Sequence, residues 1–226
     1  MNLQHRADVL ARTALFQRID ELTRRRVAER MAERCVERGQ TVFVQDELGD
    51  RMYVLAEGAV KLYVSSSNGA VVELVRHHAP AVFGELALLD GGPRSATAEA
   101  VERSTLLVVT RAELLRLLRS DEQVTEALLC LLGAIVRRTT RQLTDLVFLN
   151  LPGRVARQLL LLAEDGNGSG TITRQVTQGE LATMVGAARQ TVNQVLRSLE
   201  ARGYIRADGR AFELLDRARL ERLVER

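Results

Sequence analysis

Residues 177–203, TQGELATMVGAARQTVNQVLRSLEARG, have the pattern of two short helices joined by a tight turn. Thr177 and Glu180 stand at the capping-box spacing, in which each side chain satisfies the backbone N–H of the other residue at the start of a helix. Gly186 supplies the turn, and the second helix starts at Arg189. The stretch therefore specifies both helices and the turn between them.

The apolar residues of this stretch have the spacing of a helix-turn-helix. Ala182 is small enough for the two helices to cross closely, and Val192 and Val195 anchor the second helix. Residues 203–214 follow as a β-hairpin with an Asp208-Gly209 turn. Together these features predict a winged helix-turn-helix, whereas a generic helical hairpin would match only parts of them.

A polar cluster opens the second helix, at the end where recognition helices reach base edges. Arg and Gln are side chains that make bidentate contacts with bases. Residues 150–226 carry 12 basic against 9 acidic side chains, which is compatible with a polyanionic partner. We therefore predict binding to double-stranded DNA. The expected contacts, including the start of the first helix, are Thr177, Ala188, Arg189, Gln190, Thr191, Asn193 and Gln194.

The segments just before the helix pair give weaker signals. Residues 154–165 predict an apolar helix, and a flexible linker follows at 166–170. Residues 171–174, TITR, predict a short strand. We expect all three segments to belong to the DNA-binding part.

A single long helix is predicted upstream. Ser120 and Gln123 have a second capping-box spacing, and residues 150–153, NLPG, break the pattern at the far end. In between, mostly apolar residues recur every three to four positions: Val124, Leu128, Leu131, Ile135, Thr139, Gln142, Leu146 and Leu149. At ~1.5 Å per residue this helix is about 40 Å long, which suits a two-stranded coiled coil between two copies. The alternative is a helix buried against its own domain.

Residues 6–119 predict a β-roll preceded by helix. Residues 6–34 have near-helical apolar spacing, and from Cys35 onward this spacing gives way to short β-rich runs. Ser67-Asn68-Gly69 marks a hairpin turn, and leucines just before Arg119 indicate a short helix. Glycines separate the β-rich runs, which are 41–44, 52–55, 59–64, 70–75 and 105–109.

Composition limits the classes of protein that this chain can be. Its 46% hydrophobic content fills real cores, no apolar run approaches the ~18 residues of a membrane span, and the charged N-terminal segment predicts a cytoplasmic protein. Cys35 and Cys130 lie too far apart to suggest a metal site, so we expect both to be reduced and structural. His77 and His78 are neighbours in a predicted strand and point to opposite faces, which makes a poor chelate.

A second informative stretch is residues 83–97, FGELALLDGGPRSAT. Gly84 permits close backbone approach, and Glu85 can accept hydrogen bonds from sugar hydroxyls. Arg94 and Ser95 then offer a guanidinium, a hydroxyl and a backbone N–H to an anion, and the planar fork of Arg matches phosphate. The residues alone leave open a purely structural ion pair between Arg94 and Glu85.

The order of these parts resembles the catabolite-activator (Crp/Fnr) family of bacterial transcription regulators, from about Leu10 to the end of the chain. FGELALLDGGPRSA (83–96) is similar to the phosphate-binding cassette of that family. GRVARQLLLLA (153–163), followed by LATMVGAARQTVNQVLRSLEARGYI (181–205), is similar to its DNA-binding domain. The resemblance implies a cyclic-nucleotide β-roll, a homodimer through the long helix, and allosteric control of binding to a palindromic operator, with RNA polymerase as a further partner.

The resemblance also implies roles for residues of the cassette. Glu85 would bind the ribose 2′-hydroxyl of cyclic AMP. Arg94 and Ser95, with a backbone N–H near Ala96, would hold the cyclic phosphate. Gly84, which has no side chain, would let the nucleotide lie close to the backbone that lines the site.

Two adjacent hydroxyl residues of the long helix contact the adenine amino group in cyclic-AMP-binding members, one from each subunit. Thr139 and Thr140 hold those positions here. A polar break in an apolar seam can also serve only to fix the register of two helices, so this alternative stays open.

The chain departs from the family pattern at several positions. Residues 79–81, usually Pro-Gly-acid, are Ala-Pro-Ala, and an Arg near the purine in some members is Ile135. In the second helix of the pair, Gln190 replaces a usual Glu, Gln194 a second Arg, and Ala188 a phosphate-binding Ser. The cluster cysteines and haem ligands of other branches are absent, so we expect no metal cofactor.

We therefore predict an α+β protein in three parts: a cyclic-nucleotide-binding β-roll with N-terminal helices over 1–119, a dimerisation helix over 120–149, and a winged helix-turn-helix over 150–226. The predicted function is a homodimeric transcription regulator controlled by cyclic AMP, without enzymatic activity. One alternative is the same regulator with a different effector or none. Another is a cyclic-nucleotide-binding regulatory module of a kinase or channel, which the helix-turn-helix disfavours.

Overall fold

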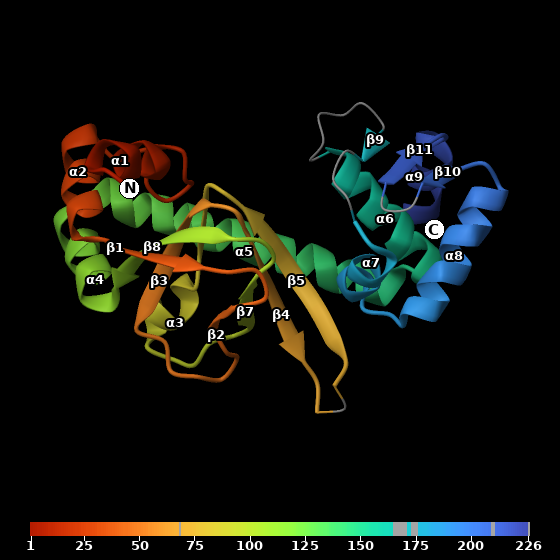
Figure 1. The fold of residues 1–226 in the computed structure, drawn as a ribbon, viewed down its shortest axis with the longest axis horizontal. Helices are drawn as coiled ribbons and strands as arrows, with labels where there is room; N and C mark the ends of the chain where they lie inside the picture. Colours follow the sequence, from red (N-terminus) through yellow and green to blue (C-terminus); the bar gives the residue numbers. More distant parts are fainter. Residues whose placement is uncertain (68, 165–170, 173–175, 209–210, 226) are drawn as a thin grey trace. The chain divides into compact units, whose positions relative to one another are not determined.

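The computed structural model describes residues 1–226 except 68, 165–170, 173–175, 209–210 and 226. The chain divides into two compact units, which are seen in Figure 1. The first unit comprises Met1–Val64 and Leu74–Val136, and the second comprises Ser65–Glu73 and Arg137–Arg226. The division falls within the long helix α5 (Glu122–Phe148).

Two four-stranded sheets form the β-roll, with strand orders β1-β8-β3-β6 and β2-β7-β4-β5. The strands are β1 (Ala32–Val36), β2 (Thr41–Phe43), β3 (Arg51–Glu57), β4 (Ala59–Ser65), β5 (Val71–His78), β6 (Ala81–Phe83), β7 (Thr97–Ala100) and β8 (Ser104–Thr110). The predicted hairpin at residues 67–69 is present, since Ser66 N donates to Ala70 O at 2.9 Å; Asn68 itself lies outside the described residues.

Strand β3 is buried on both faces, which explains its unbroken apolar run. Tyr53 and Leu55 pack between the two sheets, whereas Met52 and Val54 belong to a separate core on the other face. Successive side chains of a strand alternate in direction, so a strand covered on both sides needs apolar residues throughout. The outer core is completed by helices α1 (Leu3–Ala11), α2 (Glu21–Arg30), α3 (Glu85–Asp90) and α4 (Arg111–Ser120) and by the beginning of α5.

The prediction of continuous helix over residues 6–34 was wrong. Helix α1 ends at Ala11, α2 starts at Glu21 with Asp20 as its N-cap, and residues from Ala32 onward form β1. Leu15, Phe16 and Ile19, in the connection, are buried in the outer core. These three residues have the spacing of a helix because all three are buried, but they reach the core from a turn-rich segment and not from a helix.

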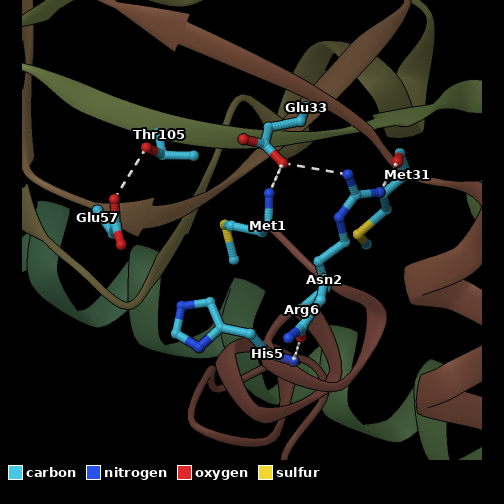
Figure 2. A network of polar contacts seen from close by, with 8 residues as sticks. All are labelled: Met1, Asn2, His5, Arg6, Met31, Glu33, Glu57 and Thr105. Atoms are coloured by element: carbon cyan, nitrogen blue, oxygen red, sulfur yellow. Dashed lines mark hydrogen bonds and ion pairs between the residues drawn. The ribbon is translucent and has the colours of Figure 1, made fainter.

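One carboxylate ties helix α1 to β1, as Figure 2 shows. Glu33 Oε2 accepts hydrogen bonds from the amino group of Met1 at 2.7 Å and from Arg6 Nη2 at 3.1 Å. Arg6 Nη1 also donates to the carbonyl of Met31 at 2.9 Å. The hydrogen bond from the Met1 amino group lowers the pKa of Glu33, against the opposing effect of burial. These contacts hold α1 against the edge of the sheet.

The long helix begins as predicted but with a different cap. Asp121, not Ser120, accepts the hydrogen bonds of the first turn, from Gln123 N at 2.9 Å and Val124 N at 3.3 Å. Ser120 is the last residue of α4 and its hydroxyl donates back to Leu117 O. A hydroxyl already engaged at the end of one helix does not cap the next, so the predicted capping box was wrong here.

The predicted apolar stripe of α5 is exposed only in part: Leu146 is 52% exposed, whereas its first members are buried. Val124 and Leu128 are buried in the outer core of the first unit, so the beginning of the helix does pack on its own domain. Leu129, Val136 and Leu143, at seven-residue spacing, are instead 64%, 63% and 61% exposed. A seven-residue apolar repeat that its own chain leaves uncovered is the pattern of a coiled-coil seam.

The second unit has its own apolar core, formed by helices and a three-stranded sheet (Figure 1). The sheet order is β10-β11-β9, and β10 pairs with β11 in antiparallel register, which confirms the predicted hairpin; Gly209 lies outside the described residues. Residues 166–170 and 173–174 of the predicted linker and strand also lie outside them. The elements are α6 (Leu151–Glu164), β9 (Thr171–Ile172), α7 (Gln178–Val185), α8 (Arg189–Ala201), β10 (Ile205–Asp208), β11 (Ala211–Leu214) and α9 (Arg217–Val224).

Three expectations about special residues can be compared with the structure. Cys35 and Cys130 are free and exposed, so neither fills a core as a structural cysteine would. Across the described part of the chain, no cluster of three or more His, Cys, Asp or Glu side chains is arranged to hold a metal ion. None of the helices that the structure describes is long and apolar enough to cross a membrane.

Candidate ligand site and candidate DNA-binding surface

The predicted cassette starts at a sharp turn from β6 into α3. Gly84 has φ +77°, in the left-handed region that glycine adopts without strain, and it is the N-cap residue of α3. Glu85 is thereby placed in the first helical turn and is buried. The sequence did not reveal α3, because the six residues between Gly84 and Gly91 are too few to show a helical period.

The guanidinium of Arg94 is buried within the cassette. Its Nη1 donates to Gly84 O at 2.8 Å and its Nη2 donates to Arg51 O at 2.7 Å. The ring of Phe43 lies against the guanidinium, with its centroid 4.1 Å from Cζ. Burial lowers the pKa of Arg94, and neighbouring negative charges, Glu85 among them, partly oppose that shift.

The two hydrogen bonds of the Arg94 guanidinium go to backbone carbonyls, not to a carboxylate. The carboxylates of Asp50, Glu47 and Glu85 act on Arg94 through their charge, each raising its pKa against the effect of burial. Burying a charge is costly unless it is paired, and a guanidinium pairs well with phosphate oxygens. The arrangement consequently favours an anionic group beside Arg94.

The remaining cassette residues follow Arg94 directly in the chain. Ser95 is exposed and Ala96 is buried, just before β7 begins at Thr97. Thr97 Oγ1 accepts a hydrogen bond from Gln45 N at 3.0 Å, which joins β7 to the segment after β2. The fold thus brings Gly84, Glu85 and Arg94 together, with Ser95 and Ala96 adjoining.

Thr139 and Thr140 are both exposed on α5. Thr140 O accepts a hydrogen bond from Thr144 Oγ1 at 2.9 Å within the helix. Both threonines belong to the second unit, so the structure does not bring them into one unit with the cassette.

The predicted helix-turn-helix is present. Thr177 Oγ1 accepts from Glu180 N at 3.1 Å and Glu180 Oε2 accepts from Thr177 N at 2.8 Å, so the capping box is formed. Gly186 ends α7 with φ +64°, a left-handed conformation that makes the turn. Ala182 and Val192 are buried in the core between the helices, and Val195 packs against it. The hydroxyl of Thr177 also donates to Glu180 Oε2 at 2.9 Å, so its single proton is engaged.

The start of α8 presents five of the predicted DNA contacts to solvent. The exposed residues are Ala188, Arg189, Gln190, Thr191 and Gln194. Asn193 does not share this exposure: it is half-buried, and its Oδ1 is a buried atom without a hydrogen-bond partner among the described residues. Its position three residues before the buried Leu196 turns it toward the helix pair rather than outward.

Comparison with known proteins identifies both parts of the chain. Residues 33–121 match the model of the cyclic nucleotide-binding domain, and residues 153–223 match that of the Crp-like helix-turn-helix domain. The chain is 34% identical to the CRP-like cAMP-activated global transcriptional regulator of Mycobacterium tuberculosis, over 95% of this chain and 98% of that protein. This chain belongs to the Crp/Fnr family.

Other members of the Crp/Fnr family match over most of their length. The cyclic AMP receptor protein of Thermus thermophilus is 35% identical over 84% of this chain and 87% of that protein. The crystal structure of the Thermus thermophilus catabolite activator protein has a TM-score of 0.56 at 32% identity, covering 94% of this chain and 98% of that one. FixK2 of Bradyrhizobium japonicum has a TM-score of 0.74 at 25% identity, covering 85% and 96%. As a Crp/Fnr protein, the chain is a DNA-binding transcription regulator with a cyclic nucleotide-binding domain.

The surroundings of Arg94 in this Crp/Fnr chain were missed by sequence reasoning. In the sequence, Phe43 is only an aromatic residue of a β-rich run, and nothing near it indicates contact with Arg94 of the cassette. The carbonyl of Arg51 carries no side-chain signal at all, because every residue has one. Only the backbone of Gly84 lay within the motif that the sequence singled out.

Proposed function

We propose that the chain is a homodimeric transcription regulator whose binding to a palindromic operator is controlled by cyclic AMP at the cassette. Its parts would be a nucleotide-binding unit over residues 1–119, a dimerisation helix over 120–149 and a DNA-binding unit over 150–226. RNA polymerase would be a further partner. The proposal rests foremost on one observation, the buried guanidinium of Arg94, whose hydrogen bonds go to backbone carbonyls.

The cassette fits a cyclic nucleotide. Arg94, with the hydroxyl of Ser95 and the backbone N–H near Ala96, would hold the phosphate, whose oxygens match the planar guanidinium. Glu85 would accept a hydrogen bond from the ribose 2′-hydroxyl, and Gly84 gives the Arg94 guanidinium room, because a Cβ atom there would lie 3.0 Å from Arg94 Nη1. The names of the Mycobacterium tuberculosis and Thermus thermophilus relatives support cyclic AMP as the nucleotide.

The exposed stripe on α5 supports the homodimer. Leu129, Val136 and Leu143 would meet the same residues of a second copy, because a two-fold axis along the helix makes each stripe its own partner. Thr139 and Thr140, exposed on the same helix, would contact the adenine amino group, one from each copy. The nucleotide would then bias the arrangement of the two helices through contacts that differ between states.

The exposed start of α8 supports sequence-specific binding. Arg189 would contact a guanine, and Gln190 and Gln194 would contact neighbouring bases or phosphates. Two such helices in a dimer require half-sites about 34–36 Å apart.

Calorimetric titration with cyclic AMP and with cyclic GMP, each with and without a palindromic duplex, tests the proposal. We expect cyclic AMP to bind more tightly than cyclic GMP and to raise affinity for the duplex, and the duplex to raise affinity for cyclic AMP by the same factor. Duplex binding that neither nucleotide changes would replace the proposal with a regulator that has another effector or none. Nucleotide binding without duplex binding would favour a regulatory module.

A further inference from the structure

The segment after β2 holds the main chain of Arg94. Arg94 N donates to Glu47 O at 2.8 Å, and Asp46 N donates to Arg94 O at 2.9 Å. Next to this pair, Leu48 and Pro93 form an isolated β-bridge. The backbone of Arg94 is therefore fixed by residues 46–48, which lie far from the cassette in sequence.

The same region of the chain holds the side chain of Arg94. Phe43, the last residue of β2, places its ring face 4.1 Å from Arg94 Cζ, and Arg51, the first residue of β3, provides a carbonyl at 2.7 Å from Nη2. An aromatic face attracts a cation, and more strongly when both are removed from water. Phe43 is itself fixed, because it stacks on Tyr53 with ring centroids 5.8 Å apart.

Gly49 leaves the space that the guanidinium occupies. A Cβ atom at this position would lie 2.7 Å from Cζ and Nε of Arg94 and 2.7 Å from Cβ of Ala87, closer than real Cβ contacts. Gly49 thus provides room both for the guanidinium and for helix α3, and no left-handed backbone is involved. Any side chain here would displace the guanidinium, α3 or the segment that carries residue 49.

The carbonyls and the ring that hold Arg94 are neutral groups, so they position the cation without neutralising it. A guanidinium has five N–H donors, and the two carbonyls use only part of them. A carboxylate in the place of the Phe43 ring would neutralise Arg94 and compete with a ligand anion. The neutral ring and carbonyls instead leave the positive charge of Arg94 available to a ligand anion.

We propose that Phe43 and Gly49 are positioning residues that hold the Arg94 guanidinium, through the Phe43 ring face and the space at Gly49, in place for the phosphate of the nucleotide. This inference rests on the proposed function of the cassette. It assigns a role to two uncharged residues outside the cassette.

A double-mutant cycle on the full-length protein tests the inference, with cyclic AMP affinity measured by calorimetry. Phe43→Leu keeps an apolar side chain but removes the ring, and we expect about tenfold weaker binding. In the Arg94→Ala background the same change is expected to have almost no effect, because the ring acts only through the guanidinium. Gly49→Ala is expected to weaken binding too, but in the Arg94→Ala background only part of its effect should disappear, because its Cβ would still meet Cβ of Ala87.

Phe16→Leu is the matched control, since it removes a fully buried ring from the outer core of the same unit. Its cyclic AMP affinity is expected to stay within twofold of wild type although its stability falls. Equal losses of affinity in Phe43→Leu and Phe16→Leu, or the same loss from Phe43→Leu with and without Arg94, would overturn the inference.

A ligand-free readout separates this inference from the proposed function. In 15N-labelled protein, the Nε–H resonance of Arg94, identified by its loss in Arg94→Ala, is expected to be shifted by the Phe43 ring current and to exchange slowly. Phe43→Leu is expected to abolish the shift, and Phe16→Leu to preserve it. Wild-type protein that binds neither nucleotide would refute the proposed function, and an unshifted Arg94 resonance would refute the positioning role.

Discussion

Thr177 and Glu180 cap helix α7 reciprocally, with each side chain accepting the backbone N–H of the other residue at 3.1 and 2.8 Å. A third hydrogen bond, from the Thr177 hydroxyl to Glu180 Oε2, closes the arrangement. Two backbone donors at the start of the first helix of the pair are thereby satisfied within the protein. The box fixes the start of α7, and through the turn at Gly186 it helps to fix where α8 begins.

Removal of this cap is expected to destabilise the second unit. Thr177→Ala should lower its free energy of unfolding by about 1 kcal/mol, the usual contribution of an N-cap hydroxyl. Thr177→Ser keeps the oxygen and is expected to lie within about 0.5 kcal/mol of wild type. Urea denaturation followed by circular dichroism measures both. Equal losses in the two variants would show that the methyl group, not the cap, carries the stability.

Arg94→Ala is expected to weaken cyclic AMP binding by about 1.5–3 kcal/mol, the range for a charged hydrogen bond. Arg94→Lys keeps the charge but loses the planar fork, so it should recover only part of the affinity. Calorimetric titration gives both values. Unchanged affinity in Arg94→Ala would disprove the assignment of the phosphate to this residue.

The stripe on α5 predicts a position-dependent effect on dimerisation. Leu143→Asp puts a charge into the proposed seam and is expected to shift the protein toward monomer in sedimentation experiments. Ala134→Asp, also exposed but on the opposite side of the helix from Val136, is the control and should remain dimeric. Dimers of equal stability in both variants would show that the dimer interface does not include this face of α5.

Thr140→Ala is expected to separate allosteric coupling from assembly. Because the Thr140 hydroxyl is proposed to contact the adenine, the variant that lacks it should respond less to cyclic AMP in duplex binding while its dimer stays intact. Duplex affinity measured with and without nucleotide gives the coupling, and sedimentation gives the dimer. A variant that mainly dissociates would indicate that the threonines only fix the register of the two helices.

The side chain at position 190 is expected to change the base preference of the operator half-site. Arg189 should retain a guanine in each half-site, worth about 1–3 kcal/mol, whereas Gln190 both donates and accepts and suits adenine. We therefore expect a half-site related to the TGTGA-like consensus of the family, with relaxed cytosine preference opposite Gln190. Selection from random duplexes tests this, and Gln190→Glu should lose affinity for the selected sites. Strict cytosine at that position would contradict this interpretation of Gln190.

A gain of charge gives an independent test at the same surface. Gln194→Arg should steepen the salt dependence of duplex binding, by about one released counterion per subunit. The slope of log affinity against log salt concentration measures it. An unchanged slope would place residue 194 away from the phosphates.

Local signals in the sequence were sufficient for the helix-turn-helix and for the order of the parts. The capping box at Thr177, the turn at Gly186 and the buried Ala182 and Val192 each depend on neighbours within a few residues. A cap or a left-handed glycine acts through its own backbone, so its meaning is already contained in a short stretch. The hairpin of β10 and β11 was predicted for the same reason.

Tertiary structure decided the features that depend on distant neighbours. Periods of 3.5 and 3.6 residues are nearly indistinguishable in a leucine-rich helix, so only packing separated the buried Leu128 from the exposed Leu129. Asn193 shares a polar cluster with Gln194, yet packing between helices turned it inward. The surroundings of Arg94 come from Phe43 and a carbonyl of Arg51, which only the folding of the roll brings to the cassette. The sequence by itself determined which residues are able to bind an anion, and the tertiary structure determined that Arg94 is buried and held by two carbonyls and an aromatic ring.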